Sequence, residues 1–381
     1  MKIVVYTIAL VTYCFSVFLC SFNTMYAQSP HEDVSSVERA KVLRVLESDM
    51  RLIPGTETEH IFQTVEAKIL SGSEEGRVVR VQNDFLRLEK GDRFFTIRYV
   101  DVEGTETYSV QDVDRRGALI LLLMFFVLAI VAFGGWYGVR ALVSLVASFF
   151  VLIYVLMPGL LAGWPPLLTA FCVAGAVLGG ALFITHGLNR ESLVAFLGTL
   201  LAVGVTLLFA TWSVSFTTLS GFAGDESVYL NFNTRGTLDL VALLVGGIVI
   251  GAIGVLDDVA ITQVSVVREL FRAMPTATRT HIFTRAMRVG REHVGAVVNT
   301  LALAYVGASL PLVLLMQVSP MSATALFNME LFATEIVRTV VGSFGIVLAV
   351  PCVTLLAVRY LKPLSDELPS SKSMTHAAHG H

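Results

Sequence analysis

The segment LDLVALLVGGIVIGAIGVLDDVAITQVSVVREL, residues 238–270, decides the fold class of this chain. It carries no charged residue from Leu240 to Leu256, and such a run approaches the ~20 residues with which a helix crosses about 30 Å of hydrocarbon. Apolar residues continue past Asp257 and Asp258, so one continuous helix over all 33 residues would be about 50 Å long. That length exceeds the hydrocarbon core, and the helix must therefore tilt, break or project beyond it.

Six further apolar stretches of comparable length occur in the chain. Hydrophobic residues make up 55% of the 381 residues and charged residues only 15%, whereas a soluble domain carries roughly 25% charged residues. We therefore predict an all-α polytopic membrane helix bundle over residues 117–361, preceded by a small β-rich extracytoplasmic domain. About seven spans are expected, at residues 118–134, 139–158, 166–185, 192–213, 238–256 with its extension, 294–316 and 336–360.

Residues 1–27 have the layout of a targeting segment. Lys2 precedes an apolar run over residues 3–20, and polar residues then lead to Ala27. This layout is typical of a signal peptide with cleavage after Ala27, and the length of the run also suits an uncleaved signal anchor. Either alternative places the following segment outside the cytoplasm.

Residues 28–116 are expected to form the β-rich domain. They hold roughly half of all charged residues in the chain, together with turn signals such as Pro54-Gly55 and Gly91-Asp92. The expected strands lie at residues 39–46, 64–70, 77–81 and 94–99. Several short strands within ~90 residues indicate a small barrel or sandwich. Such a domain is either a structural cap or a module that binds a ligand or partner.

The charges of the loops orient the expected spans. If residues 28–116 lie outside, the loops expected outside are uncharged or acidic, apart from Arg235, and the loops expected inside carry the cations. Arg115 and Arg116, at the outer end of the first span, are the exception. We therefore expect the C-terminus in the cytoplasm, with residues 362–381 as a disordered tail. The inner cations are Arg140, Arg190, Arg268, Arg272, Arg279, Arg285, Arg288, Arg291, Arg359 and Lys362.

Polar residues in segment 238–270 are the first candidates for a site. They recur at helical spacing and therefore share one face: Asp258, Thr262, Ser265 and Glu269. An ionised carboxylate within hydrocarbon costs several kcal/mol, so it indicates function. The alternative is that Asp257 and Asp258 lie at the cytoplasmic interface, on an amphipathic helix. Glycines earlier in the segment permit a break or a close helix crossing: Gly247, Gly251 and Gly254.

Two other spans carry polar residues. Asn299, beside Thr300 and on a face with Glu292, lies about six residues into its span, where an unpaired amide is costly. It either bonds a neighbouring helix or contacts a substrate. Arg338 follows Glu335 at a spacing of three residues, which suits an interfacial ion pair. Pro351 is expected to kink or break the last span.

The sequence argues against several functional classes. No basic stripe with interleaved aromatic residues suggests nucleic-acid binding. Zinc-protease, phosphate-loop and serine-hydrolase motifs are also absent. The four cysteines lie in the leader and the spans, without metal-ligand spacing. We therefore expect no enzymatic activity, no metal site and no cofactor.

Five separated motifs resemble the YibE/F-like family of bacterial membrane proteins. They are HGLNR at 186–190, GAIGVLDDVA at 251–260, VGRE at 289–292, NTLALAYVG at 299–307 and EIVRTVVGSFG at 335–345. Glu292 stands where the family usually has Asp, so a carboxylate is retained, whereas Ala296 replaces a threonine. The resemblance implies a permease-like protein of the bacterial cytoplasmic membrane. It also favours function for the segments around Asp258 and Asn299.

The leading hypothesis is a permease or secondary transporter of an unknown small solute or ion. Glycine-rich, broken spans that carry acidic and amide residues form the sites of transporters. Asp258 and Glu269 are then the cation- or proton-sensitive groups and Asn299 a polar contact. The alternative is a non-transporting receptor or assembly partner whose outer domain performs recognition, alone, as a homo-oligomer or with another membrane protein. A single cavity lined by Asp258, Asn299 and Arg338 would favour the transporter hypothesis.

Overall fold

The computed structural model describes residues 37–52, 57–84, 86–100 and 105–361. The expected leader over residues 1–27 and the expected tail over residues 362–381 lie outside the described residues. The chain divides into two units, Met1–Phe133 and Gly134–His381. The division falls inside helix α2 (Arg116–Val151), next to Gly135, whose backbone is not helical (φ 52°, ψ −129°).

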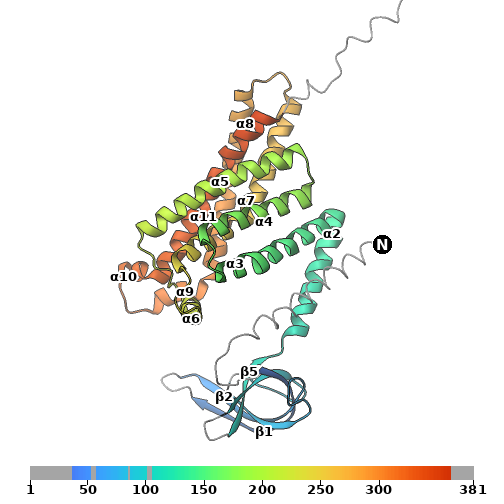
Figure 1. Ribbon diagram of the computed structural model, residues 1–381, viewed down its shortest axis with the longest axis vertical. Coiled ribbons are helices and arrows are strands. Elements are labelled where there is room, and N and C mark those ends of the chain that lie inside the picture. Colours follow the sequence, from blue (N-terminus) through green and yellow to red (C-terminus); the bar gives the residue numbers. More distant parts are fainter. Residues whose placement is uncertain (1–36, 53–56, 85, 101–104, 362–381) are drawn as a thin grey trace, which may run out of the picture. The chain divides into compact units, whose positions relative to one another are not determined.

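The first unit contains a closed five-stranded β-barrel (Figure 1). Its strands are β1 (Val37–Leu52), β2 (Glu59–Ile69), β3 (Val78–Asn83), β4 (Arg93–Val100) and β5 (Glu106–Val113). Their order around the barrel is β1-β2-β3-β5-β4, and β4 closes it by pairing with β1. The β3–β5 pair is parallel and the other pairs are antiparallel. This connectivity is that of the OB-fold barrel.

Alternation of inward apolar and outward polar residues forms the barrel. Val79 and Val81 of β3 are buried between exposed neighbours, and they join Val42, Val65 and Phe94 in the core. The prediction of a β-rich domain is therefore confirmed, and the expected strands overlap β1 to β4. The fifth strand, β5, was not predicted, because only Tyr108 and Val110 of its ETYSVQDV sequence face inward.

The second unit is helical. After α2 come one π-helical turn, η1 (Leu152–Leu156), and α3 (Met157–Leu161). The remaining helices are α4 (Pro166–His186), α5 (Arg190–Phe216), α6 (Asp225–Asn233), α7 (Leu240–Ala273), α8 (Arg279–Ala308), α9 (Leu310–Val318), α10 (Ala323–Asn328) and α11 (Glu330–Tyr360). Helices α5, α7 and α11 pack against one another, with α4 against α5 and α7, and α8 against α7 and α11.

Small residues bring these helices close together. A Cβ atom on Gly198 of α5 would lie 2.8 Å from the Cα of Val353 on α11, and one on Gly345 of α11 would lie 2.8 Å from Oγ1 of Thr206 on α5. Apolar side chains such as Ile248 and Leu256 of α7 are fully buried between the helices. The predicted helical bundle is therefore present.

Five helical segments in the described part of the chain are long and apolar enough to cross a membrane, or six if α8 and α9, bent by 66° at their junction, count as one. One of the five, Arg116–Leu161, is 46 residues long and contains two of the expected spans, 118–134 and 139–158. The non-helical Gly135 lies between these two stretches. The number of seven spans stays a prediction.

The sequence left open a break in segment 238–270 and a kink or break at Pro351, and neither helix is broken. Helix α7 continues from Leu240 to Ala273 through its glycines, and α11 continues through Pro351. At Gly251 the absence of a side chain makes room for a neighbour instead, because a Cβ there would lie 3.0 Å from the Tyr305 hydroxyl of α8. Around Pro351, the buried Val350 and Val353 pack against neighbouring helices. This packing stabilises the helical conformation of α11 on both sides of the proline.

Candidate functional site

One face of α7 is uncovered along most of the helix. The residues predicted to share this face all lie on it, and three glycines continue it towards the start of the helix. The exposed residues are Gly247, Gly251, Gly254, Asp258, Thr262, Ser265 and Glu269. The spacing of three and four residues repeats with the helical period, so they form a single stripe. We call this stripe the α7 face: glycines line one half and polar side chains the other.

A cavity of about 410 Å³ adjoins the α7 face and lies between α7, α4 and the part of α2 in the second unit. We call it the α7 cavity. Most of its lining is aliphatic, with Phe149 as the aromatic member. Its polar lining consists of Ser144, Ser148, Thr185, His186, Asp257 and Asp258.

The two carboxylates in this cavity have no cationic partner within the described residues. The Asp257 carboxylate accepts one hydrogen bond, from the backbone N–H of Asp258 at 3.0 Å. Asp258 makes no ion pair, and no Lys or Arg lines the cavity. Acids placed in largely apolar surroundings are normally paired or hydrogen-bonded. Asp257 and Asp258 are therefore available to a bound cation.

A buried hydroxyl is also unused. Ser144 is 5% exposed and lines the cavity. Its backbone carbonyl accepts a hydrogen bond from the Ser148 hydroxyl at 2.9 Å, whereas its own hydroxyl makes none in the described structure. Most buried polar groups are hydrogen-bonded, so the Ser144 hydroxyl has a free capacity that a ligand in the cavity can satisfy.

Helix α4 contributes His186 at its last residue. The helix stops there because Gly187 adopts φ 85°, a left-handed conformation that glycine adopts without strain. Thr185 and His186 thus lie at the same level of the cavity as Asp257 and Asp258. The sequence pointed to His186 only as part of a polar turn, and it did not indicate Ser144 or Ser148. Their spacing of four residues within the expected span 139–158 was the available signal.

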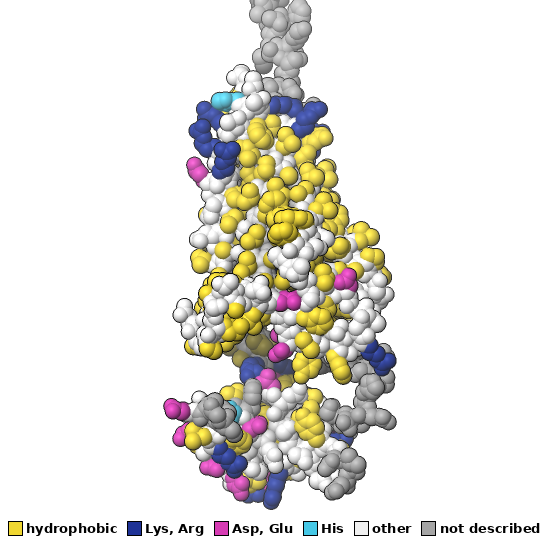
Figure 2. All heavy atoms as spheres, turned by 90° about the vertical axis from the view of Figure 1, so that its left-hand side faces the viewer, with side chains coloured by type: hydrophobic (Ala, Val, Ile, Leu, Met, Phe, Trp, Pro, Cys, Tyr) yellow, Lys and Arg dark blue, Asp and Glu magenta, His cyan; other side chains and the backbone are white. Residues whose placement is uncertain are grey.

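The polar half of the α7 face leads from the cavity to the cationic end of the helical unit. Asp258 and Glu269 are separated by 11 residues, or about 16 Å of helix. At this end Arg268 pairs with Glu191 of α5 at 2.5 Å, and Arg279 donates to the backbone carbonyl of Arg359 at 2.6 Å. Figure 2 shows Lys and Arg side chains gathered at one end of the unit, with hydrophobic side chains along its length. Arg279 and Arg359, both expected on the inner side of a membrane, therefore lie close together.

The other predicted site residues do not line this cavity. Glu292, Asn299 and Thr300 are exposed on α8, and the Thr300 hydroxyl donates to its own helix at the Ala296 carbonyl, at 3.0 Å. Arg338 pairs with Glu335 at 3.4 Å, as the sequence suggested. Asp258, Asn299 and Arg338 thus do not meet around the α7 cavity.

Arg338 belongs instead to a second polar group, between α8 and α11. The Tyr305 hydroxyl and the Nε of Arg338 are both buried without a hydrogen-bond partner in the described structure. A Cβ on Gly342 would lie 3.8 Å from the Tyr305 hydroxyl. This group has unused hydrogen-bonding capacity, but no cavity among those described adjoins it.

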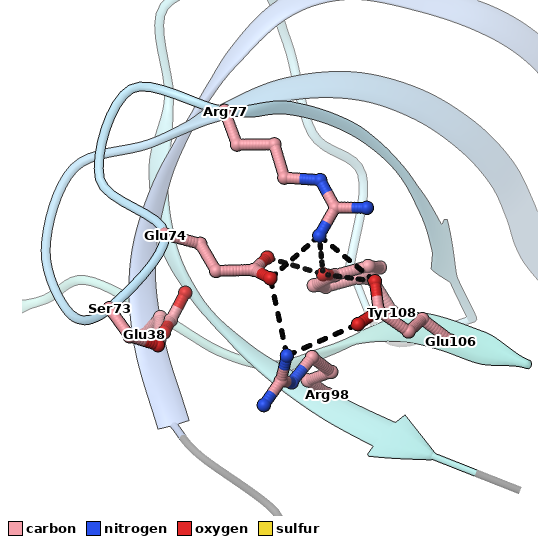
Figure 3. Close-up of polar contacts among 7 residues, drawn as sticks. All are labelled: Glu38, Ser73, Glu74, Arg77, Arg98, Glu106 and Tyr108. Carbon is pink, nitrogen blue, oxygen red and sulfur yellow. Dashed lines mark hydrogen bonds and ion pairs between the residues drawn. The ribbon is translucent and has the colours of Figure 1, made fainter. Parts of the chain in front are cut away.

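A third polar cluster holds one end of the barrel together (Figure 3). The Tyr108 hydroxyl donates to Oε2 of Glu74 at 2.6 Å, and Arg77 donates to Oε1 at the same distance. Arg98 bridges Glu74 and Glu106, at 3.2 Å each. The hydrogen bond from Tyr108, assisted by Arg77, lowers the pKa of Glu74, and burial raises the pKa of Tyr108 far above its usual range. Glu74, Arg77, Arg98 and Glu106 form ion pairs with one another, which indicates a structural role for these four residues.

Metal ligation finds no support in the described residues. No group of three or more His, Cys, Asp or Glu side chains among them is placed to hold a metal ion. The acids of the α7 cavity come as an adjacent pair with a single imidazole on another helix.

These features define the class of the protein: a small β-barrel domain followed by a bundle of long apolar helices, with two acids that form no ion pair among the described residues and line a cavity between the helices. The chain belongs to the YibE/F-like protein family, whose model matches residues 122–363, more than half of the chain. The resemblance predicted from the five motifs is thereby confirmed. The match covers the helical part and not the barrel. No curated protein and no solved structure matches the chain.

Proposed function

We propose that this protein is a multi-pass permease of the bacterial cytoplasmic membrane and that the α7 cavity is its solute site. The proposal counts seven crossings: two in Arg116–Leu161, separated at Gly135, then α4, α5, α7, the bent pair α8–α9, and α11. The five segments with suitable length and hydropathy support it, as does the gathering of arginines at one end, which is the end expected in the cytoplasm. The barrel then lies outside.

The single observation that carries the proposal is the pair of unpaired carboxylates, Asp257 and Asp258, in a cavity within apolar helices. Ionisable residues inside membrane segments are costly, and they mark substrate and ion pathways. Thr262, Ser265 and Glu269 supply a hydrophilic route from the cavity to the cytoplasmic end of α7. In the other direction Gly254 and Gly247 leave open space along the same face, whereas the Tyr305 hydroxyl of α8 lies against Gly251. One side of α7 thus offers a small solute a path between the cavity and the cytoplasmic end of the helix.

Solute flux into proteoliposomes tests this function. Wild-type protein and the variant Asp258→Asn are reconstituted at equal density, and currents are recorded on a solid-supported membrane with a panel of amines, amino acids, sugars and carboxylates. We expect flux of at least one class for the wild type and a clear loss for Asp258→Asn. Asp225→Asn, an exposed acid on α6, is the matched control and should retain full flux. Equal flux for Asp258→Asn and wild type would remove the proposed site.

A second candidate function, recognition by the outer domain, rests on the barrel. Its connectivity is that of a fold whose β2–β3 face binds oligomeric ligands in other proteins, although a fold alone does not assign function. Strand β1 also runs on to Met50 and Leu52, which are 55% and 62% exposed. Removal of residues 30–110 separates the two functions. It abolishes function if recognition is essential, and it leaves flux through the α7 cavity intact if transport is the function.

A further inference from the structure

We infer that the α7 cavity takes an organic cation with an apolar body. This inference rests on the proposed function, because it names the class of solute for the same site. Three properties of the cavity carry it: the sign of its charge, the separation of its polar and apolar ends, and its size.

The charge of the lining selects a cation. Asp257 and Asp258 are acidic, and no Lys or Arg lines the cavity to offset them. The nearby cation Arg268 is already paired with Glu191. An anion would be repelled by two adjacent carboxylates, and a neutral solute would leave them with only the His186 imidazole beside them. Asp258 is exposed and Asp257 is half-buried, so both carboxylates are accessible to a solute in the cavity. Because most of the lining is apolar, their attraction for a cation is stronger there than in bulk water.

The polar groups of the lining lie at one end of the cavity. Helices α4 and α7 run in the same direction: Gly246 packs on Ala170 near their starts, where a Cβ would lie 3.2 Å from that of Ala170, and His186 and Asp258 both line the cavity near its other end. Helix α2 runs the opposite way, because η1 and α3 follow it and contact the early part of α4. Ser144 therefore lies towards His186, away from that early part.

Apolar side chains line the opposite end. They come from all three helical elements and are Phe149, Leu152, Val173, Ala174, Ile250 and Ile253. From Ile250 to Ile261 the cavity extends over 11 residues, or about 16 Å of helix. The cavity therefore has an acidic head region, in which Leu145, Leu182 and Ile261 also lie, and an apolar body region. A bare inorganic ion would leave the body region empty, and Ca²⁺ or Mg²⁺ needs about six oxygen ligands.

The head region has the hydrogen-bonding groups for an ammonium ion. An ammonium group donates three hydrogen bonds and accepts none. Two carboxylates accept such bonds, and the hydroxyl of Ser144, which is 5% exposed and has no partner in the described structure, can accept another. The volume of about 410 Å³ lies within the usual range for small-molecule sites. It accommodates a compact amine, such as one carried on an adamantane cage.

The test compares three probes of the same shape on the full chain in lipid nanodiscs. The probes are 1-adamantylamine, a cation at pH 7, neutral 1-adamantanol and anionic 1-adamantanecarboxylate, and binding is measured by equilibrium dialysis against empty nanodiscs. Charge-assisted hydrogen bonds are strong enough for at least a tenfold preference. We expect the amine to bind at least tenfold more tightly than the alcohol and the carboxylate not to bind. Equal affinity for amine and alcohol overturns the inference, and this comparison requires no variant.

Two variants locate the site. Asp258→Asn should weaken amine binding about tenfold and leave alcohol binding unchanged, whereas the control Asp225→Asn should change neither. Ala181→Phe places a large side chain in the α7 cavity, so it should weaken binding of the amine and of the alcohol alike. Amine binding that survives both Asp258→Asn and Ala181→Phe in folded protein contradicts the inference.

Failure of this inference is distinguishable from failure of the permease proposal, because binding is measured without a gradient. Amine binding without flux of any solute leaves the cation site standing and removes the transport function. Flux of neutral or anionic solutes, with no amine binding, removes the cation site and leaves the transport function standing.

Discussion

Gln263 of α7 donates a hydrogen bond through its Nε2 to the hydroxyl of Thr354 on α11, at 2.8 Å. The same nitrogen donates to the backbone carbonyl of Ala286 on α8, at 2.9 Å. Gln263 is 2% exposed and Thr354 is fully buried. One amide therefore joins three helices on the side of α7 that lies away from the α7 face. These two hydrogen bonds fix α7 to α8 and α11 on the side opposite the proposed solute path.

Replacing Gln263 by Leu should destabilise the helical bundle. The apolar side chain keeps the volume but removes both hydrogen bonds between the helices, and each such bond contributes about 0.5–1.5 kcal/mol. Thermal unfolding of the purified protein should show a lower midpoint than for wild type. Gln317→Leu, at an exposed glutamine of α9, is the control and should leave the midpoint unchanged. An unchanged midpoint for Gln263→Leu would contradict the structural role of the amide.

Gly290 and Gly295 of α8 should respond in opposite ways to substitution by Ala. A Cβ on Gly290 would lie 2.5 Å from Cγ1 of Val350 and 2.9 Å from Oε1 of Gln263, whereas one on Gly295 meets nothing within 4 Å. Overpacking costs typically 1–3 kcal/mol, and Ala in an open helical position stabilises by up to about 1 kcal/mol. Unfolding midpoints should therefore fall for Gly290→Ala and stay or rise for Gly295→Ala. The reverse order would show that the α8 packing is different.

Helical periodicity explains why much of the bundle could be predicted. Asp258, Thr262, Ser265 and Glu269 are separated by whole turns, so their common face follows from the backbone repeat. The position of Gln263 on the buried side follows from the same repeat. What it contacts does not, because Thr354 and Ala286 are far away in the sequence. Long-range packing also decided that Gly251 would meet Tyr305 rather than break α7.

The barrel should lose protection in acid through Glu74. The hydrogen bond from Tyr108 lowers the pKa of Glu74 in the folded protein, so the carboxylate adds stability above its unfolded pKa of about 4.3. This stability is lost as pH falls through the lower, folded pKa. Amide hydrogen exchange of residues 106–113 in the full chain, corrected for intrinsic rates, should show decreasing protection below about pH 4. Glu74→Gln should be less protected at neutral pH and show a smaller acid-dependent decrease.

A neighbouring acid provides the control for this pH effect. Glu75 is exposed beside Glu74, so Glu75→Gln should retain the wild-type profile. Tyr108→Phe removes the main cause of the lowered Glu74 pKa, and it should reproduce the flatter profile of Glu74→Gln. If Tyr108→Phe retains the full acid dependence, a group other than Tyr108 causes the lowered pKa of Glu74.

Glu330, at the start of α11, should hold the turn after α5 in place. Its Oε1 accepts hydrogen bonds from the backbone N–H groups of Ser220, Gly221 and Phe222 at 2.8, 2.7 and 3.1 Å. Hydrogen bonds to a charged carboxylate are about twice as strong as bonds to the neutral oxygen of an amide. Glu330→Gln should therefore speed hydrogen exchange at residues 220–222 several-fold. Glu226 is an exposed acid on α6, and the control Glu226→Gln should leave hydrogen exchange at residues 220–222 unchanged. Equal exchange rates in the two variants would show that Glu330 does not hold this turn.

The cavity itself could be predicted only in part. Asp257 and Asp258 stand out in the sequence because acids are rare in apolar segments. Ser144 and Ser148 do not, since serine is common in helices that pack closely. Their role depends on α2 lying beside α4 and α7, which no local pattern encodes. Asn299 also stood out in the sequence, yet it faces away from the bundle core because the buried face of α8 is formed by Ile282, Ala286, Gly290 and Leu301.

Thiol labelling along α7 should reveal whether water reaches the α7 face. In a background without the four native cysteines, Thr262→Cys and Ser265→Cys place thiols at exposed positions, and Val264→Cys places one at a fully buried position. A hydrophilic route from the cytoplasmic end predicts fast reaction of the first two with a charged methanethiosulfonate in inside-out vesicles, and slow reaction of the third. Right-side-out vesicles should label all three slowly, because the arginine-rich end is then inside. If the α7 face is covered by lipid, Thr262→Cys reacts as slowly as Val264→Cys in both preparations, because a thiol in hydrocarbon does not ionise. That result would remove the path on which the permease proposal depends, whereas fast labelling only in right-side-out vesicles would reverse the orientation.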